Sequence, residues 1–197
     1  MLINYQGTLP FALLQVLQWA EGGGNNSSVT HIVADDLESF LYVFIWLCML
    51  YDGPGGVLHP PPENDGFIVH AWGEGGMGPG GIMLVLNAKI RFIYSPTDSI
   101  IDSQFTPYFN NLKPLAKEWK QLVKMEDERR EAKLSTPMYT HKDVIALLHK
   151  YADNLPDFDS LPYPVPSMHL PPEPANSVMM KWPSSFFETI FEAVTMQ

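Results

Sequence analysis

The sequence predicts a mainly α-helical domain, and three stretches of the chain support this prediction. Residues 40–51 are apolar and uncharged, and residues 114–134 alternate apolar and charged faces at helical spacing. Residues 140–151 carry an apolar stripe that begins with a capping-box pair, Thr140 and Asp143. With 197 residues and 46% hydrophobic composition, the chain is long enough for one domain with a core.

The stretch from Asp35 to Tyr51 predicts the helix around which the domain is built. Two adjacent carboxylates and Ser39 open it, and no charged residue follows before Tyr51. A helix that is apolar on every side has no face to give to water, so we expect the domain to surround a core helix at 36–51. The uncharged part is shorter than the roughly 20 residues of a membrane span, so we expect no membrane insertion.

The segments on either side of the core helix differ in kind. Residues 7–20 predict a short surface-packed helix that starts near Thr8 and Pro10. Residues 52–81 are rich in Gly and Pro and predict a long connection without regular structure. Residues 82–94 are apolar and fit a helix or a strand by periodicity alone, and we favour a helix.

The end of the chain is Pro-rich. Seven prolines fall between Pro156 and Pro174, which predicts an extended linker or tail. Ser185 and Glu188 then cap a last short apolar helix. We therefore divide the chain into a helical domain, 1–155, and a tail, 156–197.

Charge and cysteine content narrow the range of partners and compartments. Residues 1–88 contain eight acidic residues and no Lys or Arg. Such a field repels phosphate backbones, so we expect no nucleic-acid binding, and a basic peptide is the favoured partner; simple solubility is the alternative. The lone Cys48 lies in the core helix and predicts a small buried side chain in a reducing compartment, the cytoplasm or the nucleus.

Residue patterns alone predict no catalytic, cofactor-binding or metal-binding residue. Gly73, Gly75 and Gly78 match G-x-G-x-x-G, and Lys89 follows, but a phosphate-binding loop needs a preceding strand. The Gly- and Pro-rich flanks instead predict an ordinary loop. The six histidines lack metal-ligand spacing, and Asp157 lies among turn-forming residues.

Two sequence stretches, GTLPF at 7–11 and ADDLESFLYVFIWLCMLYDGP at 34–54, resemble the C-terminal lobe of the eukaryotic protein kinase fold. They are most similar to the fungal-type protein kinase (FunK) family, in which a GT-x-PF-type substrate loop precedes a DLESF-type helix with W-x-C and D-G-P patterns. Casein kinase I also carries a DDLES stretch. The residues that carry the resemblance are His31, Asp36–Phe40, Trp46, Cys48, Asp52–Pro54, Trp72, Ala88, Lys89 and Phe92.

The resemblance implies a helical C-lobe of the protein-kinase-like fold, with the N-lobe and the catalytic loop missing. The family transfers phosphate from ATP to Ser or Thr, with ATP and Mg²⁺ bound in the complete domain. By resemblance, the substrate loop contains Gly7, Thr8, Pro10 and Phe11, and Asp36 is the core-helix anchor of the catalytic loop. A family glutamate that bonds an arginine is replaced by Gln15, so we expect that contact to be weaker.

The motifs that the chemistry of the family needs do not occur in the sequence: no phosphate-covering Gly-rich loop with a strand lysine, no H-R-D and no D-F-G. We therefore predict a non-catalytic remnant or pseudokinase-like binding module. The alternatives are a truncated product of an active kinase and a scaffold protein. Without the other lobe, we expect apolar area to be exposed around Phe40, Val43, Phe44 and Leu47, and self-association to follow.

Overall fold

The computed structural model describes residues 9–22, 32–53, 57–62, 66–74, 80–134 and 138–152, which all belong to one compact unit spanning Met1–Phe158. Within these residues the predicted mainly helical fold is confirmed: they contain no β-strand, and one antiparallel bridge joins Tyr51 to Leu58. A second unit, Asp159–Gln197, lies outside the described residues, as does the predicted tail with its final helix.

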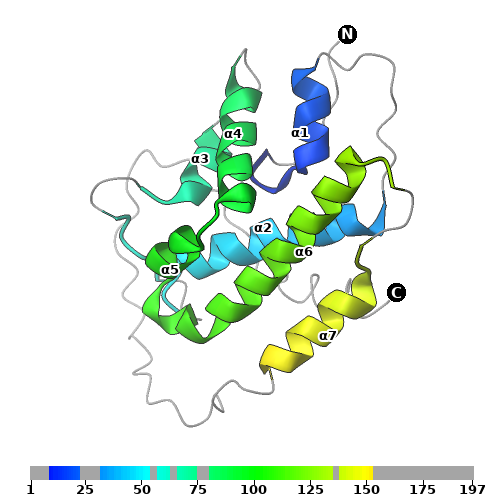
Figure 1. Cartoon of the computed structure of the whole chain (residues 1–197). Helices are drawn as coiled ribbons and strands as arrows, with labels where there is room; N and C mark the ends of the chain where they lie inside the picture. The colour runs from blue at the N-terminus through cyan, green and yellow to red at the C-terminus, as the bar shows by residue number, and fades with distance from the viewer. Residues whose placement is uncertain are drawn as a thin grey trace. The chain divides into compact units, whose positions relative to one another are not determined.

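Two long helices, α2 and α6, cross at the centre of the unit (Figure 1). Helix α2 also packs against α7 and η1, whereas α4 lies beside α1 and packs against α3 and α6. In chain order the described elements are η1 (Leu9–Phe11), α1 (Leu14–Glu21), α2 (Val33–Leu50), α3 (Ile68–Glu74), α4 (Gly81–Tyr94), α5 (Ser99–Gln104), η2 (Pro107–Leu112), α6 (Lys113–Glu131) and α7 (His141–Ala152).

The predicted core helix is α2, and most of its length is buried. The apolar side chains Leu41, Ile45, Cys48 and Met49 are at most 1% exposed, so this side of the helix forms the centre of the core. The opposite side is only partly buried, along the stripe predicted to be bare: Phe40, Val43, Phe44 and Leu47. Neighbouring aromatic rings cover part of that stripe.

Helix α6 supplies one of these rings. Phe44 stacks on Trp119 with ring centroids 6.0 Å apart, and its edge faces Phe105 at 6.4 Å. The stripe is therefore packed against the core in part and is not an open apolar patch.

Two predictions about the first half of the chain are wrong. The first α-helix begins at Leu14 and not near Pro10, which lies in the 3₁₀ turn η1. Residues 52–81 are not all irregular, since α3 lies within them. Two interactions with the rest of the unit stabilise α3: the Trp72 side chain is fully buried, and the Ile68 amide donates a hydrogen bond to Gln104 Oε1 (2.9 Å). A Gly- and Pro-rich sequence does not reveal either of them.

The helices predicted in the second half are confirmed. Residues 82–94 form α4, the stretch after Pro114 forms α6, and α7 follows the predicted capping pair. In that pair, Asp143 Oδ2 accepts hydrogen bonds from the Thr140 amide (2.7 Å) and hydroxyl (2.8 Å). None of the described helices has the length and apolar character that a bilayer span requires.

Candidate functional site

Residues 11–15, which run from the last residue of η1 into the first turn of α1, are held by polar side chains of three other helices. We call these residues the anchored segment. At its start, the Phe11 carbonyl accepts a hydrogen bond from Ser39 Oγ of α2 (2.9 Å). At its end, Gln15 Oε1 accepts one from Arg130 Nη1 of α6 (2.8 Å). The segment is therefore fixed at both ends by tertiary contacts.

Glu38 of α2 supplies the N-terminal cap of α1. The first amides of a helix need acceptors from outside the helix, and the residue before α1, Leu13, has none to offer. Glu38 Oε1 accepts the hydrogen bond of the Leu14 amide (2.8 Å) and also that of the Tyr42 hydroxyl (2.8 Å). The position at which α1 begins is thus set by a side chain of another helix.

Lys89 of α4 binds the backbone of Ala12, two residues before the capped amide of Leu14. Its side chain is fully buried, and Nζ donates a hydrogen bond to the Ala12 carbonyl. The ammonium lies 3.6 Å from the centroid of the Tyr42 ring and 5.6 Å from that of Trp72, where the ring faces attract a cation. Glu38 and Lys89 therefore hold neighbouring backbone groups from two different helices.

Burial shifts the pKa values of both groups toward their neutral forms. Burial raises the pKa of Glu38, although hydrogen bonds from Leu14 and Tyr42 and the charge of Lys89 work against this. Burial lowers the pKa of Lys89 well below its ordinary value, and the charge of Glu38 opposes that shift. The two donors at the Glu38 carboxyl group and the aromatic faces at Lys89 Nζ partly offset the cost of desolvating these groups.

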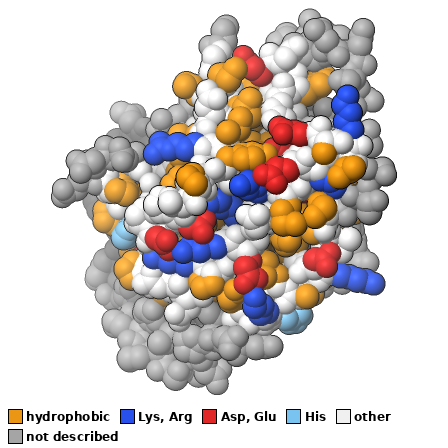
Figure 2. Space-filling view, in the orientation of Figure 1, with side chains coloured by type: hydrophobic (Ala, Val, Ile, Leu, Met, Phe, Trp, Pro, Cys, Tyr) orange, Lys and Arg blue, Asp and Glu red, His pale blue; other side chains and the backbone are white. Residues whose placement is uncertain are grey.

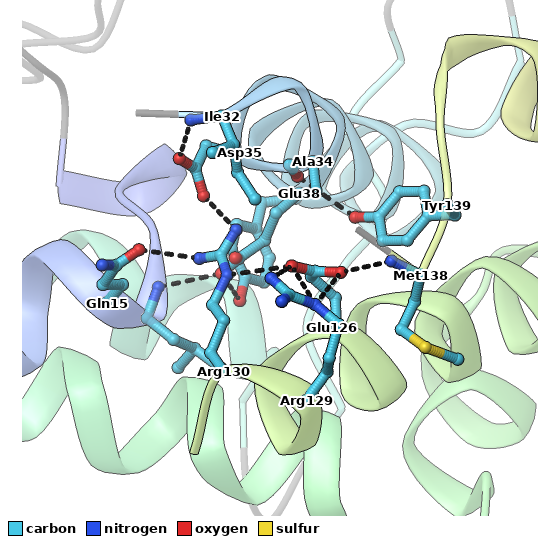
Figure 3. Close-up of polar contacts among 12 residues, drawn as sticks. Gln15, Ile32, Ala34, Asp35, Glu38, Glu126, Arg129, Arg130, Met138 and Tyr139 are labelled. Carbon is cyan, nitrogen blue, oxygen red and sulfur yellow. Dashed lines mark hydrogen bonds and ion pairs between the residues drawn. The ribbon is translucent and has the colours of Figure 1, made fainter. Parts of the chain in front are cut away.

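Arg130 connects the anchored segment to the start of α2 (Figure 3). Besides Gln15, its guanidinium donates to Asp35 Oδ1 and to Glu126 Oε1 (3.2 Å). The Asp35 side chain is fully buried, and its other oxygen, Oδ2, accepts a hydrogen bond from the Ile32 amide (2.7 Å). This hydrogen bond caps the N-terminus of α2. One arginine thereby joins α1, α2 and α6.

Glu126 extends this network toward α7. Arg129 Nε lies 3.0 Å from both of its carboxylate oxygens, and the Met138 amide donates to Oε2 (2.8 Å) (Figure 3). Burial raises the pKa of Glu126, but hydrogen bonds from Arg129, Met138 and Arg130 outweigh it, so the pKa is lowered overall. The ionised carboxylate fixes the chain just before α7.

The residues predicted by resemblance fall partly within this site. Pro10 and Phe11 lie in η1, and the Phe11 and Trp46 rings meet edge to face, with centroids 5.7 Å apart. Asp36 is exposed on α2, whereas its neighbour Asp35 is the buried carboxylate. The sequence predicts a weakened arginine contact at Gln15, and Arg130 Nη1 donates a hydrogen bond to this residue (2.8 Å). Gly7, Thr8 and His31 lie outside the described residues.

Sequence reasoning missed Glu38, Lys89 and Asp35 as parts of a site. A signal was present for Lys89, because it follows Val85 by four residues and precedes Phe92 by three, on the apolar face of α4. Glu38 likewise precedes Tyr42 by four residues on the buried face of α2. A lone charge in an apolar stripe indicates a buried partner on another element.

The described residues contain no group of three or more His, Cys, Asp or Glu side chains that could hold a metal ion. Lys89, which follows the glycine motif in the sequence, is fully buried in the core. Acidic, basic and hydrophobic side chains are interspersed on the face of the molecule shown in Figure 2. An open depression between α6 and α7 is also lined by mixed side chains: Glu118, Gln121, Leu122, Asp143, Ala146, Leu147 and Lys150.

No known family model matches this chain, and no match is found among curated proteins or solved structures. The resemblance to fungal-type protein kinases therefore rests on the sequence motifs alone.

Proposed function

We propose that this chain forms the helical, substrate-side part of a fungal-type protein-kinase-like fold and acts as a pseudokinase-like module that binds a basic segment of a partner protein. The observation that carries the proposal is the anchored segment. It begins at Phe11, the last residue of the motif that resembles a substrate loop, and Gln15, which by resemblance replaces an arginine-bonding glutamate, accepts a hydrogen bond from Arg130. A reducing compartment suits the buried Cys48.

A segment fixed in this way favours binding. A partner loses less affinity when the surface it meets is already ordered, because no loop has to be ordered on association. Residues 1–88, which carry eight acidic residues and no Lys or Arg, supply negative charge for a basic partner. Among the described residues of this stretch, the acidic side chains Glu21, Asp36 and Asp52 are exposed, so their field acts on solutes in water.

Fluorescence anisotropy with labelled peptides tests the proposal. A Ser/Thr-containing peptide rich in Lys and Arg is compared with one of equal length rich in Asp and Glu, at low and high salt. We expect binding of the basic peptide only, weakened by salt and by the double change Asp36→Asn/Asp52→Asn. The matched control is Glu128→Gln, which removes an exposed charge from α6. Equal binding of both peptides would contradict the proposal.

We further expect that this chain alone does not transfer phosphate. Phosphoryl transfer depends on positioning and on neutralising charge through a lysine, metal-holding residues and a catalytic aspartate. The motifs that supply them do not occur in the sequence. The test is thermal unfolding with and without Mg-ATP, together with phosphate incorporation by purified protein. Nucleotide-dependent stabilisation would favour the alternative of a truncated active kinase.

A further inference from the structure

Residues 57–62, with the sequence VLHPPP, lie between α2 and α3, and we call them the proline segment. Two backbone hydrogen bonds tie its first half to the end of α2. The Asp52 amide donates to the Val57 carbonyl (2.8 Å), and the His59 amide donates to the Leu50 carbonyl (2.7 Å). The last four residues of the segment belong to no helix, strand or turn. The segment therefore continues as extended chain from a fixed base.

The three successive prolines restrict this extended backbone to the polyproline II region. Each proline ring fixes its own φ at about −65°, and a residue that precedes a proline is pushed toward a ψ of about +120 to +160°. His59, Pro60 and Pro61 each precede a proline. These angles are close to those of the polyproline II helix, which has three residues per turn. We therefore expect side chains three positions apart in the proline segment to share an edge.

One edge of the proline segment faces the folded unit, and the other two face water. The inner edge consists of His59 and Pro62, which are half-buried, and the His59 ring lies beside Phe67, with ring centroids 5.8 Å apart. The side chains of the other two edges are exposed: Val57 and Pro60 on one, Leu58 and Pro61 on the other. The exposure thus repeats every three residues, as it does when a polyproline II helix lies with one edge on a surface.

We propose that the proline segment is a docking site for a protein domain whose aromatic-lined groove binds polyproline II helices. The two exposed edges enter the groove, while the inner edge stays on the unit. Domains of this kind gain affinity because their ligand is already extended before it binds. Here the proline rings and the two hydrogen bonds at the base order the segment in advance, so association costs little backbone entropy.

The charges near the proline segment indicate what surrounds the partner's groove. Asp52 is exposed at the base of the segment, and Glu63 and Asp65 follow it in the sequence. No Lys or Arg occurs among residues 1–88 to balance them. A groove with Lys or Arg at its rim is therefore favoured, and salt should weaken its binding. This inference uses residues outside the anchored segment and does not depend on the proposed binding of a basic peptide.

Binding of purified SH3, WW and EVH1 domains to the whole chain tests the docking site, because all three bind polyproline II segments in aromatic-lined grooves. The domains are chosen for Lys or Arg at the groove rim, and each is first shown to bind a proline-rich peptide. Methyl NMR of the whole chain reports where a domain binds. We expect at least one domain to shift the methyl signals of Val57 and Leu58 and to leave those of the fully buried Val85 unchanged.

Matched variants separate the exposed edges from proline content. Pro61→Ala removes a ring from an exposed edge, whereas Pro62→Ala removes one from the inner edge. Pro61→Ala should weaken binding at least about tenfold, the scale of truncating a side chain at the centre of an interface, and Leu58→Ala, on the same edge, should do the same. Pro62→Ala should weaken it much less. The tail variant Pro171→Ala/Pro172→Ala, outside the described residues, should bind as the unchanged protein does. Urea unfolding of each variant, with an unchanged midpoint, shows that the fold is kept.

Each outcome bears on the inference. A loss in Pro61→Ala and Leu58→Ala that the inner-edge variant and the tail variant do not share supports the docking site. No binding by any domain of the panel overturns it, and so does binding that leaves the methyl signals of the proline segment unchanged. Equal losses in Pro61→Ala and Pro62→Ala would also overturn it, because proline content and not the exposed edges would then be recognised. Binding that is lost in the tail variant would place the site in the tail instead.

Discussion

The change Arg130→Met should be among the most damaging single changes in the described part of the chain. Arg130 is the cationic partner of Asp35, whose side chain is fully buried, and it also holds Gln15 and Glu126. Without it, Asp35 stays buried and retains the Ile32 amide as a donor but loses its cation. Breaking one side of a buried ion pair costs about 3 to 5 kcal/mol. Because the Arg130 side chain is 16% exposed, water can partly replace it, and we expect about 3 kcal/mol.

Urea unfolding followed by circular dichroism measures this loss as a lower transition midpoint at unchanged slope. The control is Arg91→Met, which removes an exposed arginine from α4 and should change the free energy of unfolding by about 0.5 kcal/mol or less. The double variant Arg130→Met/Asp35→Asn should be more stable than Arg130→Met, since no charge is then left unpaired.

A loss below about 1 kcal/mol for Arg130→Met would refute the reasoning, because it would place the arginine among ordinary surface ion pairs. A double variant that is less stable than Arg130→Met would also refute it. The Asp35 carboxylate would then be satisfied by other groups, and its burial would not depend on the guanidinium.

Three smaller effects follow from the same contacts. Asp36→Asn should cost about 1 kcal/mol or less by urea unfolding, because Asp36 is exposed and interacts with the N-terminus of α2 through its charge. Ser39→Ala should cost about 1 kcal/mol in the same assay, the usual net loss of one hydrogen bond, here to the Phe11 carbonyl. The pKa of Asp143 is lowered by hydrogen bonds from the Thr140 hydroxyl and amide. Its stabilisation is therefore present above the ordinary pKa of aspartate and lost as the pH falls through the lower folded value. Thermal unfolding between about pH 6 and pH 3 should accordingly show a shallower acid loss in Asp143→Asn than in the unchanged protein.

The helices that the sequence predicted correctly are those whose local pattern agrees with their environment. Helix α7 has a capping pair and an apolar stripe within a dozen residues, so its start needs no information from elsewhere. For residues 82–94, the sequence did not distinguish a helix from a strand, because apolar residues occupy several faces of α4. Its neighbours explain why, since α4 packs against α1, α3 and α6.

The start of α1 shows why the remainder could not be predicted. Pro10 is well suited to the first turn of a helix, and local rules place the start there. The α-helix begins at Leu14 because Glu38, 24 positions away, supplies the cap. Likewise α3 depends on Gln104, which lies 36 positions from Ile68. Contacts of this range leave no periodic signal in the segment that they stabilise.

Helix α2 combines two functions along its length, and this explains its sequence. Its first half carries two buried carboxylates, Asp35 and Glu38, which bind the anchored segment and Arg130. Its second half, around Ile45 and Met49, buries only apolar groups. Replacing buried ion pairs by apolar residues often leaves a protein as stable or more so, so their presence here is not explained by stability. We propose that the paired charges instead restrict the anchored segment to one arrangement, as the proposed binding function would require.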